Sequence, residues 1–166
     1  MPNEDLSPAR ATYRHGDLKR ALLDAGVVLA REGGPAAVVL REATRRAGVV
    51  PNAAYRHFQN HQALLEAVRA EALSELARAI EAEIHATRRL RDPRQRARAA
   101  FRGVGLGYLR FARHEPGLFR TAFVARPFDV DERAPDDGAA RGASGMVPFE
   151  LLGHTLDGMV QAGLLP

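Results

Sequence analysis

The chain of 166 residues contains no cysteine and no tryptophan. Without cysteine it has neither disulfide bonds nor thiolate metal ligands. It also lacks any run of about 18 apolar residues, and its N-terminus lacks the charged and then apolar pattern of a secretory signal segment. These absences lead us to expect a cytoplasmic protein with no membrane partner.

Motifs for catalysis are missing as well. The sequence contains no glycine-rich phosphate loop, no nucleophile elbow and no pair of carboxylates framed by apolar residues. His57 and His61 have the spacing of two metal ligands on one helix, but a predicted helix boundary at Gln59-Asn60 separates them. We therefore expect no enzyme activity, no metal and no cofactor.

Basic residues outnumber acidic ones, which gives a formal net charge of +4. The excess lies in residues 1–62, which hold nine basic and six acidic residues, whereas residues 63–166 hold fifteen and fourteen. A basic excess at one end is typical of a protein that binds nucleic acid there, although most charged runs are ordinary solvated faces.

Residues 35–65 contain the most informative pattern. An apolar spacing of three and four predicts a short helix that ends at Gly48, with these residues on its inner face: Val39, Leu40, Ala43 and Ala47. Pro51 suits the first turn of a second short helix through Phe58. An amphipathic helix over Gly16–Arg31 provides the brace that two such short helices need. The pattern predicts a helix-turn-helix, for which DNA is the first partner to consider.

Longer helices are predicted after this motif. One runs from His61 to about Arg89, with Asn60 as its N-cap residue. A second begins at Pro93, after a cap at Asp92, and runs to about His114.

The last third of the chain has a weaker pattern. A short helical turn is predicted over Leu118–Phe123, and a helix over Pro148–Gln161 that stops at Gly163. Residues 126–145 are rich in proline, glycine and aspartate, and we expect a mobile loop there.

Several linked motifs resemble those of TetR-type bacterial transcriptional regulators. They occur in the expected order: Tyr13-Arg14-His15-Gly16-Asp17-Leu18, Leu40-Arg41-Glu42, Ala47-Gly48-Val49, Ala54-Tyr55-Arg56-His57-Phe58 and Ala63-Leu64-Leu65. The resemblance covers roughly residues 13–68. It implies an all-α chain with a disordered arm over 1–12 and a three-helix helix-turn-helix head over 13–60. A long helix would join this head to a helical ligand-sensing and dimerisation body over 61–166.

The resemblance also implies a function. The chain would be a repressor that binds an inverted-repeat, double-stranded DNA operator as a homodimer and is released by an unidentified small-molecule effector. Relatives usually continue with further dimerisation helices, so the chain is either naturally short or incomplete at its C-terminal end, and we favour the second. The alternative is a helical interaction or scaffold protein with a non-specific or vestigial head, which would leave the arginine cluster unexplained.

Ten residues are the candidates for DNA contact: Arg41, Arg45, Arg46, Pro51, Asn52, Ala53, Tyr55, Arg56, His57 and His61. The arginines fit phosphate contacts or solvated faces. Asn52 would read a base or cap the helix, and Tyr55 would reach a phosphate or join the core. Phe58 is expected in the core. Residues 12–15 would be a disordered tag or a basic arm in the minor groove.

The chain departs from the family pattern in places that affect DNA contact. Val50 and Pro51 stand where relatives often carry a serine or threonine, and His61 stands where they tend to carry a lysine. Some usual phosphate or base contacts are therefore expected to be absent. Ala43-Thr44 stands where relatives usually have an isoleucine-alanine pair, so the apolar core beneath the second short helix is smaller.

The resemblance further implies an apolar effector pocket among the body helices. Eight residues are its candidate lining: Phe101, Tyr108, Phe111, Phe119, Phe123, Phe149, Leu152 and His154. Each of them would equally suit the hydrophobic core.

Overall fold

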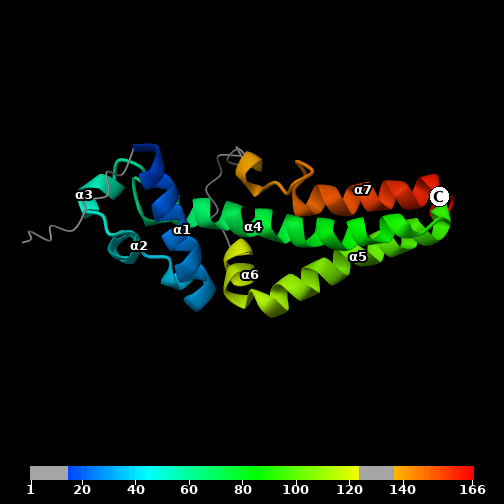
Figure 1. The fold of residues 1–166 in the computed structure, drawn as a ribbon, viewed down its shortest axis with the longest axis horizontal. Helices are drawn as coiled ribbons and strands as arrows, with labels where there is room; N and C mark the ends of the chain where they lie inside the picture. Colours follow the sequence, from blue (N-terminus) through cyan, green and yellow to red (C-terminus); the bar gives the residue numbers. More distant parts are fainter. Residues whose placement is uncertain (1–14, 124–136) are drawn as a thin grey trace, which may run out of the picture.

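The structure is a computed structural model that describes residues 15–123 and 137–166 (Figure 1). The described regular structure is entirely helical, which confirms the predicted fold class. The α-helices are α1 (His15–Gly33), α2 (Leu40–Ala47), α3 (Pro51–Ala54), α4 (His61–Ala86), α5 (Pro93–His114), α6 (Pro116–Ala122) and α7 (Pro148–Gln161). Short 3-10 helices are η1 (Pro35–Ala37), η2 (Thr87–Arg89) and η3 (Asp137–Ala140). The arm expected over 1–12 and the tag or basic arm expected around residues 12–14 lie outside the described residues.

The helices form an elongated molecule around α4 (Figure 1). Helices α1 to α3 lie at one end, and α4 runs from there along the length of the molecule, flanked by α5 and α7. Helix α6 packs against both α1 and α4. The C-terminal end returns to the start of α5, where Arg94 Nη2 donates a hydrogen bond of 2.9 Å to the carbonyl oxygen of Gly163. No helix within the described ranges is long and apolar enough to cross a membrane.

Local sequence signals set several helix ends as predicted. The side chain of Asn60 accepts a hydrogen bond of 2.8 Å from the backbone N–H of Ala63, and Asp92 likewise caps α5. Gly48 and Gly163 adopt the left-handed conformation after α2 and α7, with φ of 67° and 63°. A residue with a side chain would be strained there, so the two glycines end their helices.

Several helix boundaries differ from the prediction. Helix α4 ends at Ala86, with η2 following it to Arg89, and α6 spans Pro116–Ala122 rather than Leu118–Phe123. Two further differences lie at α3 and α2. Helix α3 ends at Ala54, because the backbone N–H groups of His57 and Phe58 both donate to the Ala54 carbonyl oxygen and form a turn. Val39 is the N-cap residue of α2 and 45% exposed, while Thr44 takes a buried place on that helix. The hydroxyl of Thr44 donates to the Arg41 carbonyl oxygen at 2.6 Å, so its burial leaves no unpaired polar atom.

The segment expected as a mobile loop is only partly described. Residues 126–136 lie outside the described ranges, but η3 and the turn that follows it have defined positions. The Glu81 carboxylate on α4 accepts hydrogen bonds of 2.8 Å from the backbone N–H groups of Ala143 and Ser144. Glu81 lies some sixty residues before this turn in the sequence, so no local sequence pattern predicts that the turn is attached to α4.

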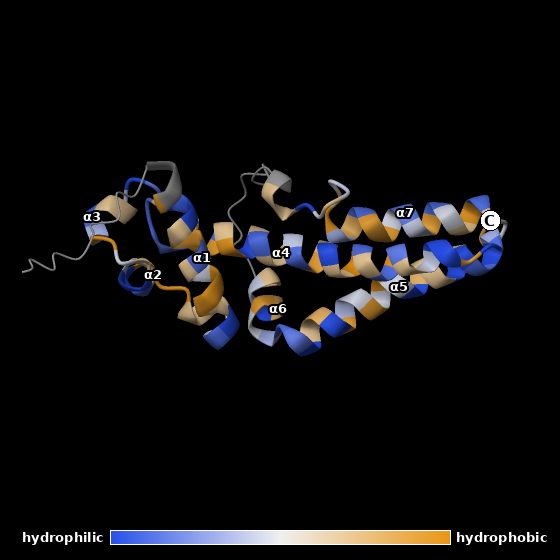
Figure 2. Cartoon of the chain, viewed as in Figure 1, coloured by the Kyte–Doolittle hydropathy of each residue, from blue (hydrophilic) through white to orange (hydrophobic). Residues whose placement is uncertain are grey.

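The buried hydrophobic core is one cluster that extends from the end formed by α1, α2 and α3 to Ile80 on α4 and Leu151 on α7, and α4 is its axis. Apolar residues occur on several sides of α4 rather than in one stripe (Figure 2). This distribution fits a helix that is surrounded by α1, α5, α6 and α7. Its buried apolar residues are Leu64, Leu65, Val68, Ala72, Leu76, Ala77 and Ile80. Helix α4 therefore joins the end of the molecule formed by α1, α2 and α3 to the rest of the chain through a shared core.

Candidate DNA interface and effector pocket

Helices α2 and α3 are held rigidly by a small apolar cluster. Leu40 and Ala43 on α2, Ala54 on α3, and Phe58 after it are all buried. Phe58 is only 3% exposed, which confirms its expected place in the core. The left-handed Gly48 lets Val49 N–H donate back to the Thr44 carbonyl oxygen at 3.0 Å. These contacts fix the turn between the two helices and hence the orientation of α3.

The outer side of α3 and its following turn presents the predicted contact residues to solvent. Pro51, Asn52, Tyr55 and Arg56 are exposed, whereas Ala53 and His57 are half-buried. His61 is exposed at the start of α4.

The structure decides between alternatives for two of these side chains. Tyr55 is 57% exposed, so it is not a core aromatic and its hydroxyl is accessible. The N-cap residue of α3 is Val50, with no side-chain cap hydrogen bond, so Asn52 does not cap the helix. Its amide therefore faces solvent at the start of α3.

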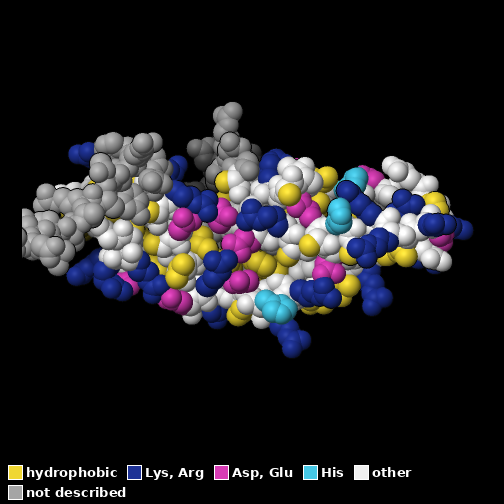
Figure 3. Space-filling model, in the orientation of Figure 1, with side chains coloured by type: hydrophobic (Ala, Val, Ile, Leu, Met, Phe, Trp, Pro, Cys, Tyr) yellow, Lys and Arg dark blue, Asp and Glu magenta, His cyan; other side chains and the backbone are white. Residues whose placement is uncertain are grey.

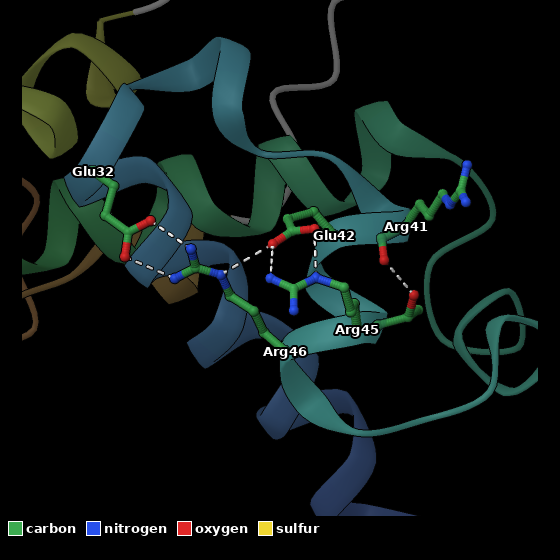
Figure 4. Close-up of polar contacts among 6 residues, drawn as sticks. Glu32, Arg41, Glu42, Arg45 and Arg46 are labelled. Carbon is green, nitrogen blue, oxygen red and sulfur yellow. Dashed lines mark hydrogen bonds and ion pairs between the residues drawn. The ribbon is translucent and has the colours of Figure 1, made fainter.

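Of the four candidate arginines, two form ion pairs and two form none among the described residues. Figure 4 shows Arg41, Arg45 and Arg46. Arg45 donates to the Glu42 carboxylate at 2.6 and 2.9 Å. Arg46 donates to Glu32 on α1 at 2.6 and 2.8 Å, and also approaches Glu42 at 3.5 Å. Within residues 15–123 and 137–166, the side chains of Arg41 and Arg56 form no ion pair.

These ion pairs stabilise the ionised carboxylates. The hydrogen bond from Arg45 lowers the pKa of Glu42 to about 2, and the hydrogen bond from Arg46 lowers the pKa of Glu32. Arg46 thus ties α2 to α1, a contact that the spacing of residues within α2 does not show. Basic side chains are visible at the end of the molecule that holds α2, and also along the rest of this face (Figure 3). Among the described residues, Arg41 and Arg56 have no acidic partner, so their positive charge is available for phosphate contacts.

A second candidate site is a cavity of about 360 Å³ among α4, α5 and α7. Its lining is mostly apolar: Arg69, Leu73, Ile80, Val104, Tyr108, Phe123, Ala140, Val147, Pro148, Phe149 and Leu152. Burial raises the pKa of the Tyr108 hydroxyl, so that group stays neutral at physiological pH. A mostly apolar cavity with a few polar groups is typical of small-molecule sites.

Four of the eight predicted pocket residues line this cavity: Tyr108, Phe123, Phe149 and Leu152. Phe119 lies behind them, with its ring centroid 5.3 Å from that of Tyr108 and 4.9 Å from that of Phe123. The structure places the remaining three elsewhere: Phe111 is buried in the core, Phe101 is exposed outside the cavity, and His154 borders neighbouring depressions. Arg69 was not predicted, because an arginine on a long helix usually belongs to its solvated face.

No group of three or more histidine, aspartate or glutamate side chains suited to a metal ion occurs in the part of the chain that the structure describes.

Comparison with known proteins identifies the helix-turn-helix. Residues 22–68 match the family of bacterial regulatory proteins described as the tetR family. The matched segment begins in α1, includes α2 and α3, and ends in the first turns of α4. Searches of curated proteins and of solved structures found no match. By its sequence and geometry, this segment is a DNA-binding helix-turn-helix of the tetR type, which supports a DNA-binding transcriptional regulator of that family.

Proposed function

We propose that this regulator is a ligand-responsive repressor that acts in the cytoplasm and binds an inverted-repeat operator as a homodimer. The observation that carries the proposal is the exposed face of α3 and its following turn, with Asn52, Tyr55 and Arg56 in solvent. Arg41 on α2 likewise forms no ion pair among the described residues. A family DNA-binding segment with such a face suits sequence-specific binding rather than a purely structural role.

In the proposed complex, α3 enters the major groove of DNA. Asn52 pairs with a base edge, for which an asparagine amide suits adenine. Arg41, Arg56 and the Tyr55 hydroxyl contact phosphates, and His61 contacts a phosphate at the start of α4. Pro51, Ala53 and His57 lie at the periphery of this contact. Two copies of α3 would lie about 34 to 36 Å apart, or a multiple of that distance, to meet successive grooves.

Arg45 and Arg46 have a different part in this proposal. Since Glu42 and Glu32 already bind their guanidinium groups, Arg46 acts by holding α2 on α1. Arg45 reaches a phosphate only by exchanging its Glu42 partner for it. Most of the salt-dependent affinity is then assigned to Arg41 and Arg56.

The cavity is the proposed effector site, and α4 and α6 connect it to the DNA-binding end. Phe123, which lines the cavity, directly follows α6, and α6 packs against α1. At the same junction, Arg31 on α1 donates to Glu75 on α4 at 2.8 Å and to Glu115 before α6 at 3.1 Å. A ligand that displaces Phe123 or shifts α4 would move α1 and α3, and so lower operator affinity.

We also propose that the DNA-binding domain spans residues 13–60 and the effector-binding and dimerisation domain spans residues 61–166. Leu64 and Leu65 in the first turns of α4 are buried, and α4 packs against α1. Helix α4 would therefore contribute to the hydrophobic cores of both domains.

The experiment that tests this proposal is selection of bound duplexes from a random DNA library at near-physiological salt. An enriched inverted repeat supports a dimeric operator-binding regulator, and its release from the protein then provides a screen for effectors. Recovery of no motif, with only salt-sensitive binding, contradicts the proposal and favours the interaction or scaffold protein.

A further inference from the structure

We propose that the cavity binds an apolar monoanion, with a hydrocarbon body and one carboxylate, and that Arg69 binds the carboxylate. The inference rests on the cavity's role as the effector site in the proposed function. It adds the chemical class of the effector and the residue that selects its charge.

Arg69 is the feature of the cavity that its apolar lining does not explain. Its side chain is 21% exposed, and its Nε is a buried donor with no hydrogen-bond partner. Among the described residues, no other buried side-chain nitrogen or oxygen lacks a partner. Leaving a buried donor of a charged group unpaired is costly, and Arg69 also lines the cavity. An acceptor bound in the cavity would offset this cost once the guanidinium turns toward it.

The neighbouring carboxylate does not replace such an acceptor. Glu66 Oε2 lies 3.9 Å from Arg69 Nη1, which is too far for a hydrogen bond. The other carboxylate oxygen, Glu66 Oε1, accepts a hydrogen bond of 2.9 Å from Gln62. The guanidinium therefore keeps the ability to bind a planar carboxylate through two parallel donors.

The rest of the lining sets the other properties of the ligand. Among the described residues that line the cavity there is no carboxylate, and Tyr108 is the only polar side chain besides Arg69. A cation would be repelled by Arg69, a neutral molecule would leave Nε unpaired, and a phosphate monoester would bury a second charge without a partner. The cavity volume of about 360 Å³ is near the lower end of the range for small-molecule sites, which suits a medium-chain or single aromatic acid.

The test compares matched carboxylates and alcohols by calorimetric titration of the full chain at neutral pH. The probe pairs are octanoate with octanol, decanoate with decanol, and benzoate with benzyl alcohol. We expect at least one carboxylate to bind about tenfold or more tightly than its alcohol, as one charge-assisted pairing provides. R69M should abolish this preference while leaving the affinity for the alcohol nearly unchanged, and R69K should keep part of it.

Two further variants keep the test independent of the stability of R69M. R78M removes another α4 arginine, which pairs with Glu71 at 3.1 Å outside the cavity lining, and should leave the preference intact. E66Q removes the negative charge closest to Arg69 and should tighten carboxylate binding without changing alcohol binding. Circular dichroism and the urea midpoint of each variant show whether it is folded.

The proposal is overturned if carboxylates and alcohols bind equally, if no carboxylate binds, or if the preference survives in R69M. None of these results bears on DNA recognition, which the library selection measures with ligand-free protein. Conversely, failure of that selection would remove the repressor function but leave the measured charge preference of the cavity unchanged. The two proposals therefore fail in separate experiments.

Discussion

Gly117 at the start of α6 packs directly against the backbone carbonyl oxygen of Ala30 on α1. A Cβ at Gly117 would overlap this oxygen and also that of Arg31, and neither backbone atom moves independently of α1. This contact places α6 against α1, between the cavity and the DNA-binding end.

We expect G117A to lower the free energy of unfolding by about 2 kcal/mol, the usual cost of overpacking a close contact. It should also weaken DNA binding, although Gly117 itself lies far along the chain from α3. Urea unfolding and a DNA-binding titration measure the two effects.

The matched control is G105A on α5, where an added Cβ meets no atom within 4 Å. Alanine favours a helix over glycine, so the control should raise stability by up to about 1 kcal/mol. Equal stability of the two variants would contradict the close α6 to α1 contact.

Asn60 tests the cap that begins α4. Because its side chain accepts from Ala63 N–H, N60A should lower the free energy of unfolding by about 1 kcal/mol. N60D retains an acceptor at the same position and should keep most of the stability. Thermal and urea unfolding of both variants provide the measurement, and an N60A protein as stable as N60D would show that the cap contributes nothing.

The helices and several of their ends were predictable because their causes are local. Asn60, Asp92 and Gly48 act within four residues of themselves, so a single segment of sequence contains the cause and the effect. Burial of Phe58 was also predictable, since it follows from the apolar spacing of the helix-turn-helix.

The candidate sites were less predictable because they depend on distant partners. Glu32 on α1 accepts hydrogen bonds from the guanidinium of Arg46, and the spacing of residues within α2 does not predict this pairing. Arg69 acquires its place in the cavity only when α5 and α7 pack around α4. Phe101 and Phe111 both lie on α5, but Phe101 is exposed and Phe111 is buried in the core, and neither lines the cavity. Packing and not residue type decides which aromatic side chain is covered.

Arg56 tests the phosphate contacts. R56A removes one of the two unpaired arginines, so it should weaken binding to all DNA sequences by a similar factor. The slope of log affinity against log salt should also fall by about one. Fluorescence anisotropy at several salt concentrations measures both, with R45A as the comparison, because its guanidinium already pairs with Glu42. An R56A slope equal to that of the unmodified chain would exclude a phosphate contact.

Asn52 tests the reading of base sequence. N52A should relax the preference at a single base position, with a loss of discrimination of about 1 to 3 kcal/mol there. Its affinity for unrelated DNA should remain unchanged, since Asn52 carries no charge. Repeating the library selection with the variant shows which position is affected. Uniform weakening on every sequence would mean that Asn52 does not read a base.

Glu42 tests the electrostatic balance of the DNA-binding end. Its pKa in the folded protein is about 2, below the ordinary value of 4.5, because Arg45 donates to its carboxylate. A lowered pKa means that the folded state favours the ionised form. The stabilisation is therefore fully present above pH 4.5 and is lost as the pH falls from 4.5 toward 2.

We expect the urea midpoint of E42Q to lie below that of the unmodified chain at neutral pH and to approach it as the pH nears 2. D157N is the control: Asp157 is exposed on α7 and forms no ion pair among the described residues, so its substitution should leave the midpoint nearly unchanged throughout. At neutral pH, E42Q should also tighten DNA binding, because it removes a negative charge near the phosphates and frees Arg45 to contact them. Weaker DNA binding by E42Q would instead mean that the Glu42 carboxylate holds α2 in its binding orientation.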